Sequence, residues 1–243
     1  MPAFPTWLDT TCTVTLIAGA LCAVAVFIDV LRRPQTMAVM NIVWPVCALF
    51  GILLTLWLYW RFGRSAAKGA QHSARASGTP AHKVPFAVQV ATAALHCGSG
   101  CTLGDILAEW LAFLFPAVAI AFGWHSLFDE KTYPVWILDF LVAFILGVAF
   151  QYLAITPMRK LTPAQGIVAA LKADALSLLA WQIGMYCLMA ILQFVLFKHR
   201  FGGLAPVDSV EFWAAMQLAM IGGFVSSYPM NWWLIRYGLK ESM

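Results

Sequence analysis

Charged side chains are scarce in this sequence: Asp, Glu, Lys and Arg make up 11% of its 243 residues, whereas 62% of the residues are hydrophobic. A soluble domain carries about 25% charged and 45–50% apolar residues. The excess apolar surface therefore needs lipid. The formal charge of +4 is typical of basic loops at an anionic membrane face, and we expect no nucleic-acid partner.

Three familiar signals are also missing. The sequence has no ATP-binding motif, so any transport must be passive, ion-coupled or driven by a partner. Residues 1–9 carry no basic region, and no small-residue cleavage site follows the first apolar run, which we interpret as a retained helix. Four of the six cysteines stand singly in apolar runs, which argues against a disulfide framework; they are Cys12, Cys22, Cys47 and Cys187.

Long apolar runs, in contrast, are abundant. A membrane span needs about 20 apolar residues, and six segments satisfy this: 11–31, 37–60, 102–123, 135–156, 174–197 and 211–231. Because lipid cannot satisfy backbone groups, we predict helices and therefore an all-α, polytopic membrane protein. Its expected parts are a two-helix membrane hairpin (1–60), a basic flexible linker (61–85) and a four-helix core (86–243).

Basic residues favour the cytoplasmic side of a membrane protein. With six alternating spans, ten of them fall on the side of both termini and five on the other. We therefore predict that both termini lie in the cytoplasm and that the protein resides in a bacterial inner membrane. Arg32 and Arg33 argue against this, because they fall in a short loop on the poorer side.

A conspicuously polar stretch lies near the beginning of the predicted four-helix core. His96, Cys97, Cys101, Asp105 and Glu109 lie within fourteen residues. An acidic side chain at mid-membrane costs roughly 2.5–3.5 kcal/mol on the insertion scale, and such residues usually mark a functional site. This stretch is therefore the first candidate site.

Two conformations of this stretch are compatible with the sequence. In the one we favour, Gly98 and Gly100 break the helix and Thr102 caps a new one. In the other, the helix is continuous and Cys97, Cys101, Asp105 and Glu109 form one stripe at four-residue spacing. His96 would then point about 100° away from the stripe.

Two thiols and an imidazole suit a soft metal ion, with copper or zinc as the natural candidates. We therefore predict His96, Cys97 and Cys101 as metal ligands. A redox role is less natural, because the usual dithiol motif has two intervening residues and this one has three. The third interpretation is that both cysteines are small residues of a packed helix.

Other polar residues of the core fall at corresponding ends of alternating spans. We expect them to line one vestibule with Asp105 and Glu109, because intramembrane polar groups face the bundle interior. These residues are Gln151, Asp174, Gln182, Met230 and Asn231. Further along the same span, Met185 shares a face with Gln182, and its thioether is a possible soft ligand on the pathway. The small residues Gly222, Gly223, Ser226 and Ser227 instead predict close helix packing.

Several stretches of the core resemble a known family. They are 94–105, 147–152, 172–177, 181–186 and 228–234. Over roughly residues 85–243, the sequence resembles the bacterial integral membrane family called domain of unknown function 4396. The resemblance implies a multi-helix bacterial membrane protein and no particular mechanism.

These observations lead to three hypotheses. The first is binding and translocation of a soft metal cation, copper(I) before others, with no resident cofactor identified beyond that ion. The second is a membrane thiol oxidoreductase that uses Cys97 and Cys101. The third is a non-catalytic assembly partner of another membrane complex or of a second copy of this chain. An enzyme is not indicated by the sequence.

Overall fold

The computed structural model describes residues 4–66, 84–159 and 161–240, which form helices and no strand. The long helices are α1 (Thr6–Arg32), α2 (Met40–Arg61), α4 (Phe86–Leu114), α6 (Thr132–Arg159), α7 (Pro163–Ala190) and α9 (Val210–Arg236). The short ones are η1 (Gly63–Ala66), α5 (Pro116–Ala121), and the π-helical η2 (Ile191–Phe197) and α8 (Lys198–Phe201) that prolong α7. The predicted all-α class is confirmed, while most of the predicted linker 61–85 lies outside the described residues.

Four helices in the described residues are long and apolar enough to cross a membrane: Thr6–Arg32, Met40–Ser65, Thr132–Thr156 and Pro163–Phe201. Large apolar side chains cover their outer faces; Leu21, Leu53 and Ile145, for instance, are each at least 65% exposed. Such a surface is stable against hydrocarbon and not against water. The membrane character predicted from composition is therefore supported by length and exposure alike.

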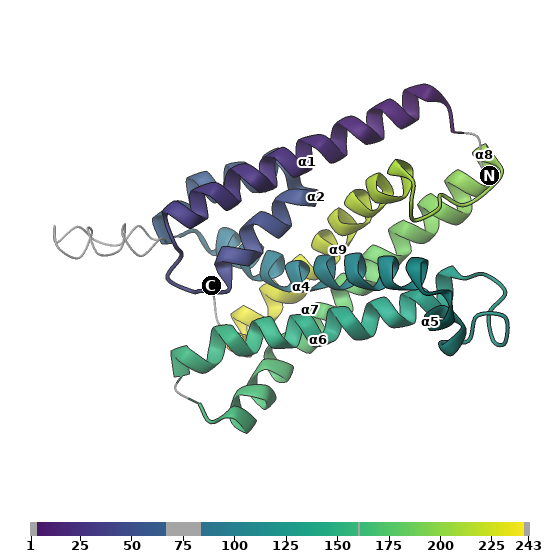
Figure 1. Ribbon diagram of the computed structural model, residues 1–243. Helices are drawn as coiled ribbons and strands as arrows, with labels where there is room; N and C mark the ends of the chain where they lie inside the picture. The colour runs from purple at the N-terminus through teal and green to yellow at the C-terminus, as the bar shows by residue number, and fades with distance from the viewer. Residues whose placement is uncertain (1–3, 67–83, 160, 241–243) are drawn as a thin grey trace.

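Helix α4 lies at the centre of the bundle, where it packs against α2, α6, α7 and α9 (Figure 1). Every residue from Ala93 to Thr102 is buried. Small residues one turn apart bring α4 and α6 together: a Cβ on Gly100 would lie 2.8 Å from the Gly147 Cα, and one on Gly104 would lie 2.5 Å from the Ala143 Cα. The two backbones are therefore in direct contact, as in other small-xxx-small pairs.

Helices α7 and α9 form the most extensive helix pair. A Cβ on Gly184 of α7 would lie 2.6 Å from the Gly222 carbonyl oxygen of α9. The Ser226 hydroxyl donates a hydrogen bond to the Ala180 carbonyl across the same interface, at 2.7 Å. The close packing predicted from the small residues of α9 is confirmed.

The break expected at Gly98 and Gly100 does not occur. Helix α4 runs unbroken from Phe86 to Leu114, so the continuous-helix interpretation is right and the capped one is wrong. The Thr102 hydroxyl donates to the Gly98 carbonyl within the helix, at 2.8 Å, instead of capping a new one. The glycines serve packing. The helix ends at Leu114, because Phe115 precedes Pro116 and is pushed out of the helical region.

Helix α2 folds back on itself at Ile52, whose φ of 42° is unusual for a β-branched residue. The rings of Trp44 and Tyr59 meet at 5.5 Å, and the Thr55 hydroxyl donates to the Cys47 carbonyl at 3.3 Å. In a straight helix, Trp44 and Tyr59 would be about 22 Å apart. The segment predicted as a membrane span over 37–60 is therefore a helical hairpin.

Neighbouring helices hold both ends of the hairpin. At the tip of the hairpin, the Gln217 side chain of α9 donates to the Leu49 carbonyl at 2.7 Å. At its base, Asp29 of α1 accepts from Tyr59 at 2.8 Å and pairs with Arg64 at 2.6 Å. Irregular backbone at membrane depth is tolerated only when it is buried in protein in this way.

The reversal places the two chain ends at opposite ends of the bundle (Figure 1). Phe4 contacts the rings of Phe197 and Phe201 at one end, which we call the Glu109 end. The segment after α9 closes the other, which we call the Lys240 end. Helices α1, α4, α6, α7 and α9 each connect these two ends, whereas both arms of α2 return to the Lys240 end.

The hairpin makes a direct prediction. Cysteines replacing Trp44 and Tyr59 should form a disulfide under mild oxidation, detected by mass spectrometry, because their rings are in contact. The control pair, Trp44→Cys with Trp57→Cys, should not cross-link, since Trp57 is 56% exposed on the outer face. Equal yields from both pairs would contradict the hairpin.

Candidate functional site

The predicted stripe of polar residues lies on the inner face of α4. Cys97, Cys101 and Asp105 have no exposed surface, and Glu109 is 5% exposed. Four-residue spacing on a continuous helix places these side chains one above the other. They run from the middle of the bundle toward its Glu109 end.

The two thiols form the centre of the stripe. Cys97 and Cys101 contact each other, and the Asp174 carboxylate of α7 lies beside Cys97. The thiol of Cys47, on the α2 hairpin, lies within electrostatic range of Cys97 and donates to the Leu95 carbonyl at 3.2 Å. All three cysteines are free thiols.

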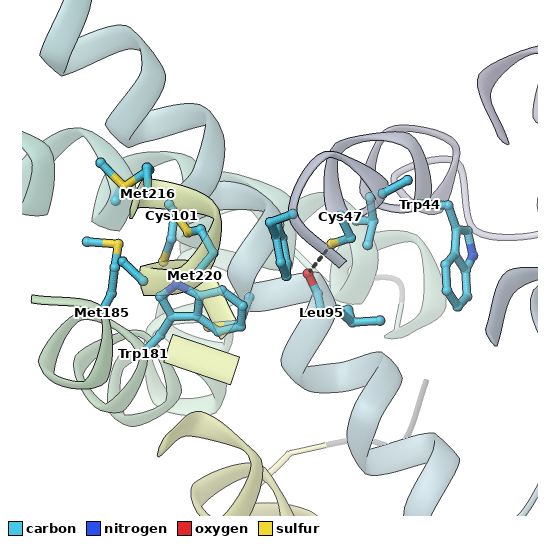
Figure 2. Close-up of a cluster of buried hydrophobic side chains, with 14 of the residues drawn as sticks. Trp44, Cys47, Leu95, Cys101, Trp181, Met185, Met216 and Met220 are labelled. Carbon is cyan, nitrogen blue, oxygen red and sulfur yellow. Dashed lines mark hydrogen bonds between the residues drawn. The ribbon is translucent and has the colours of Figure 1, made fainter. Parts of the chain in front are cut away.

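Thioethers surround the thiol pair. Figure 2 shows Met185, Met216 and Met220 next to Cys101 and the Trp181 indole, all within one buried cluster. The Met220 sulfur accepts a hydrogen bond from the Thr102 hydroxyl at 3.5 Å. Met185, which the sequence placed on the pathway, therefore lies in one cluster with Met216 and Met220 of α9.

Carboxyl groups gather toward the Glu109 end. Asp105, Glu109 and Asp139 of α6 are close enough to interact electrostatically, and the Gln182 amide lies beside Asp105. The carboxyl oxygens of Asp105 and Asp139 are buried without a hydrogen-bond partner in the described chain. Sequence reasoning missed Asp139, although a lone acid inside the apolar run 135–156 was a usable signal.

Glu109 connects this carboxyl cluster to a cavity. The cavity measures about 250 Å³ and is lined by Glu109, Lys131, Gln193 and residues 204–207 of the α8–α9 loop, among others. The Gln193 amide fixes that loop by two hydrogen bonds to the Ala205 backbone, at 2.8 and 3.2 Å. The stripe therefore opens at the Glu109 end.

His96 does not join the two thiols. On the continuous helix its imidazole faces another direction, with the Phe150 ring at 6.4 Å and Asp174 and Lys240 within electrostatic range. Neither ring nitrogen has a hydrogen-bond partner among the described residues. Within those residues, no group of three or more His, Cys, Asp or Glu side chains is arranged to hold a metal ion.

A buried ion pair closes the Lys240 end. The Lys240 ammonium donates to Asp174 at 2.5 Å and to the Asn231 side-chain oxygen at 2.8 Å. Ser177 donates to the same Asn231 oxygen at 3.0 Å. The predicted vestibule residues Asp174 and Asn231 are thus brought together by Lys240. From the sequence, this lysine was counted only among the basic residues near the C-terminus.

Two other predicted residues stand apart from these contacts. Gln151 of α6 is fully buried, and its amide has no partner within the described chain. It follows Phe150, which contacts His96, so it lies at the level of the thiols. Met230 is half-buried on α9 and adds no hydrogen bond to the site in the part of the chain described.

Replacing Asp105 by Asn and replacing Asp174 by Asn should change the free energy of unfolding in opposite directions. Asp105→Asn should raise the free energy of unfolding by about 1–3 kcal/mol, because it removes a buried acidic group that has no hydrogen-bond partner among the described residues. Asp174→Asn should lower it by about 3–5 kcal/mol, because the buried Lys240 ammonium would lose its carboxylate partner.

Chemical unfolding in detergent measures both effects. The control is the exposed Asp208→Asn, expected within about 0.5 kcal/mol of the parent protein. A loss of stability in both Asp105→Asn and Asp174→Asn would contradict this assignment.

The polar stripe on α4, its partners on α6 and α7 and the cluster at the Lys240 end all belong to one continuous part of the chain. A search of curated proteins and a search of solved structures gave no match. A family model does match, over residues 88–240, which contain every residue of the site except Cys47. The chain therefore belongs to the family described as domain of unknown function 4396.

Proposed function

We propose that this protein resides in a bacterial inner membrane and translocates a soft metal cation, copper(I) first, along the inner face of α4. One observation carries the proposal: the buried thiols on that face are followed by the buried carboxyl group of Asp105, which has no hydrogen-bond partner among the described residues. A carboxylate deprived of both water and partners is strongly unfavourable. A passing cation would supply the missing charge and the missing contacts.

Sulfur accounts for the choice of ion. Thiolate and thioether ligands select copper(I) over the harder divalent ions. Cys97 and Cys101 lie one turn apart, and the buried cluster around them holds Met185, Met216 and Met220. The thiol pair with these thioethers is a softer ligand set than the His96, Cys97 and Cys101 group expected from the sequence.

The carboxyl cluster would then carry the ion between the thiols and the aqueous cavity. Asp105 follows Cys101 by one turn, and Glu109 follows Asp105 and lines the cavity. Gln182 would solvate the ion beside Asp105. Asp139, which faces both acids from α6, would add negative charge or accept a released proton.

The orientation of the protein follows from its basic residues. We propose that α1, α4, α6, α7 and α9 cross the membrane and that the α2 hairpin enters it from the Lys240 end. The helix ends and connections at the Lys240 end carry Arg32, Arg33, Arg61, Arg64, Arg159, Lys172, Arg236 and Lys240, against Lys131, Lys198 and Arg200 at the Glu109 end. The positive-inside rule then places the Lys240 end in the cytoplasm.

This topology replaces the six alternating spans expected from the sequence. The N-terminus lies outside and the C-terminus inside, since they occupy opposite ends of the bundle. Arg32 and Arg33 no longer argue against the assignment, because both arms of α2 return to their side. The cavity beside Glu109 opens toward the periplasm.

Metal binding tests the function. Purified protein loaded with silver(I), a redox-stable stand-in for copper(I), should retain the metal in the parent protein and lose it in Cys97→Ser/Cys101→Ser. The control variant Cys12→Ser/Cys187→Ser should retain it, since neither residue belongs to the stripe. In proteoliposomes, Asp105→Asn should bind silver but transport at least tenfold less. Equal retention by both double variants would overturn the proposal.

The same preparations distinguish the competing function. A stable Cys97–Cys101 disulfide that exchanges catalytically with thiol substrates would favour a membrane oxidoreductase. Full burial of both thiols argues against it, because exchange needs an accessible sulfur.

Topology makes a separate prediction. In spheroplasts, a protease should remove a tag fused to the N-terminus and an epitope inserted after the exposed Leu127. A tag at the C-terminus should survive until the cells are lysed. Protection of the N-terminal tag, with cleavage after Leu127, would instead support both termini in the cytoplasm.

A further inference from the structure

We propose that Asp174, Ser177 and Asn231 form a binding site for a small monovalent cation, and that the ammonium group of Lys240 occupies this site as a tethered ligand. The site differs in chemistry from the thiol stripe. Its ligands are hard oxygens, which favour alkali-metal or ammonium ions over copper(I). The inference therefore stands whether or not the chain transports a soft metal.

The contacts of Lys240 resemble those of a bound ion. Its nitrogen lies 2.5 Å from Asp174 Oδ1, 2.8 Å from Asn231 Oδ1 and 3.5 Å from Ser177 Oγ. The side chains of Lys240 and Asp174 are both fully buried. A carboxylate, an amide and a hydroxyl, contributed by two helices, thus converge on one positive charge.

The oxygen ligands are oriented by other bonds. The Asn231 amide nitrogen donates to the Ser227 carbonyl at 2.9 Å, which turns the amide oxygen toward the cation. Asp174 and Ser177 lie three residues apart on α7 and therefore share a face of that helix. The extensive α7–α9 interface holds the two sides of the site at a fixed separation.

The site has ligands that Lys240 does not use. Asp174 Oδ2 is buried without a partner, and so are both ring nitrogens of the neighbouring His96. A spherical ion could contact both carboxylate oxygens, whereas the tethered ammonium bonds to one of them. The single carboxylate in direct contact matches one positive charge, and hence a monovalent ion.

The segment that carries Lys240 can leave the site without unfolding α9. Helix α9 ends at Arg236, and Gly238 turns the chain back with a φ of 70°. Three backbone bonds hold this turn: Leu239 and Lys240 donate to the Leu234 carbonyl at 2.9 and 3.2 Å, and Gly238 donates to the Ile235 carbonyl at 3.1 Å. A cavity of about 620 Å³, lined by Gly238 and Leu239, borders the segment on its outer side.

Removal of the tethered ligand tests the site. In purified Lys240→Ala, lithium, sodium, potassium or ammonium chloride should raise the apparent Tm saturably above its value in N-methylglucamine chloride of equal ionic strength, because a ligand of the native state stabilises it. The parent protein should respond little, and Lys240→Ala/Asp174→Asn should not respond. An apparent Tm of Lys240→Ala that is the same in all five chlorides would overturn the proposal.

A second measurement uses the parent protein and needs no variant. An amine-acylating reagent should modify Lys240 far more slowly than Lys198, whose side chain is 51% exposed. The ion that stabilises Lys240→Ala should accelerate modification of Lys240 several-fold by displacing it, and leave Lys198 unchanged. If the acylation rate of Lys240 does not depend on the cation, Lys240 and Asp174 form a structural salt bridge only, and the proposal is wrong.

Discussion

The close contact of α4 with α6 is the constraint on which the other features depend. Gly100 and Gly104 on one helix meet Gly147 and Ala143 on the other, so the two backbones touch. A helix packed this tightly has no lipid-facing side along its middle turns. Its polar residues are therefore buried in protein, where the bilayer itself cannot oppose them. The whole candidate site is a consequence of placing the most polar helix at the centre of the bundle.

From that centre the site divides into chemically different zones. Sulfur surrounds Cys97 and Cys101, carboxyl groups follow toward Glu109, and oxygen ligands hold Lys240 at the opposite end. Soft and hard ligands thus follow each other along α4 from Cys97 to Glu109, whereas the oxygen ligands of Lys240 come from α7 and α9. The two ends also differ in access, because Glu109 lines a cavity whereas Lys240 seals its own site. In the proposed translocation path, Lys240 therefore closes one end, and access from that end depends on this residue.

Local pattern was sufficient for some of these features and insufficient for others. The four-residue spacing from Cys97 to Glu109 correctly predicted the stripe that forms if the helix is continuous. The small residues of α9 correctly predicted a helix interface. The glycines at 98 and 100 misled, because glycine marks a helix break and a close packing contact equally well. Ile52 misled for the opposite reason: a β-branched residue gives no sign of a chain reversal, which Gln217, Asp29 and Arg64 stabilise from elsewhere.

By itself, the sequence determined that the chain is helical, that it belongs in lipid and that its polar chemistry is concentrated on the segment after residue 85. These properties depend on composition and on periodicity along one helix. Only the tertiary structure decided that α2 turns back, that Asp139 joins Asp105 and that Lys240 fills the space between Asp174 and Asn231. Each of these depends on contacts between residues far apart in the chain, and no local pattern encodes which helix faces which.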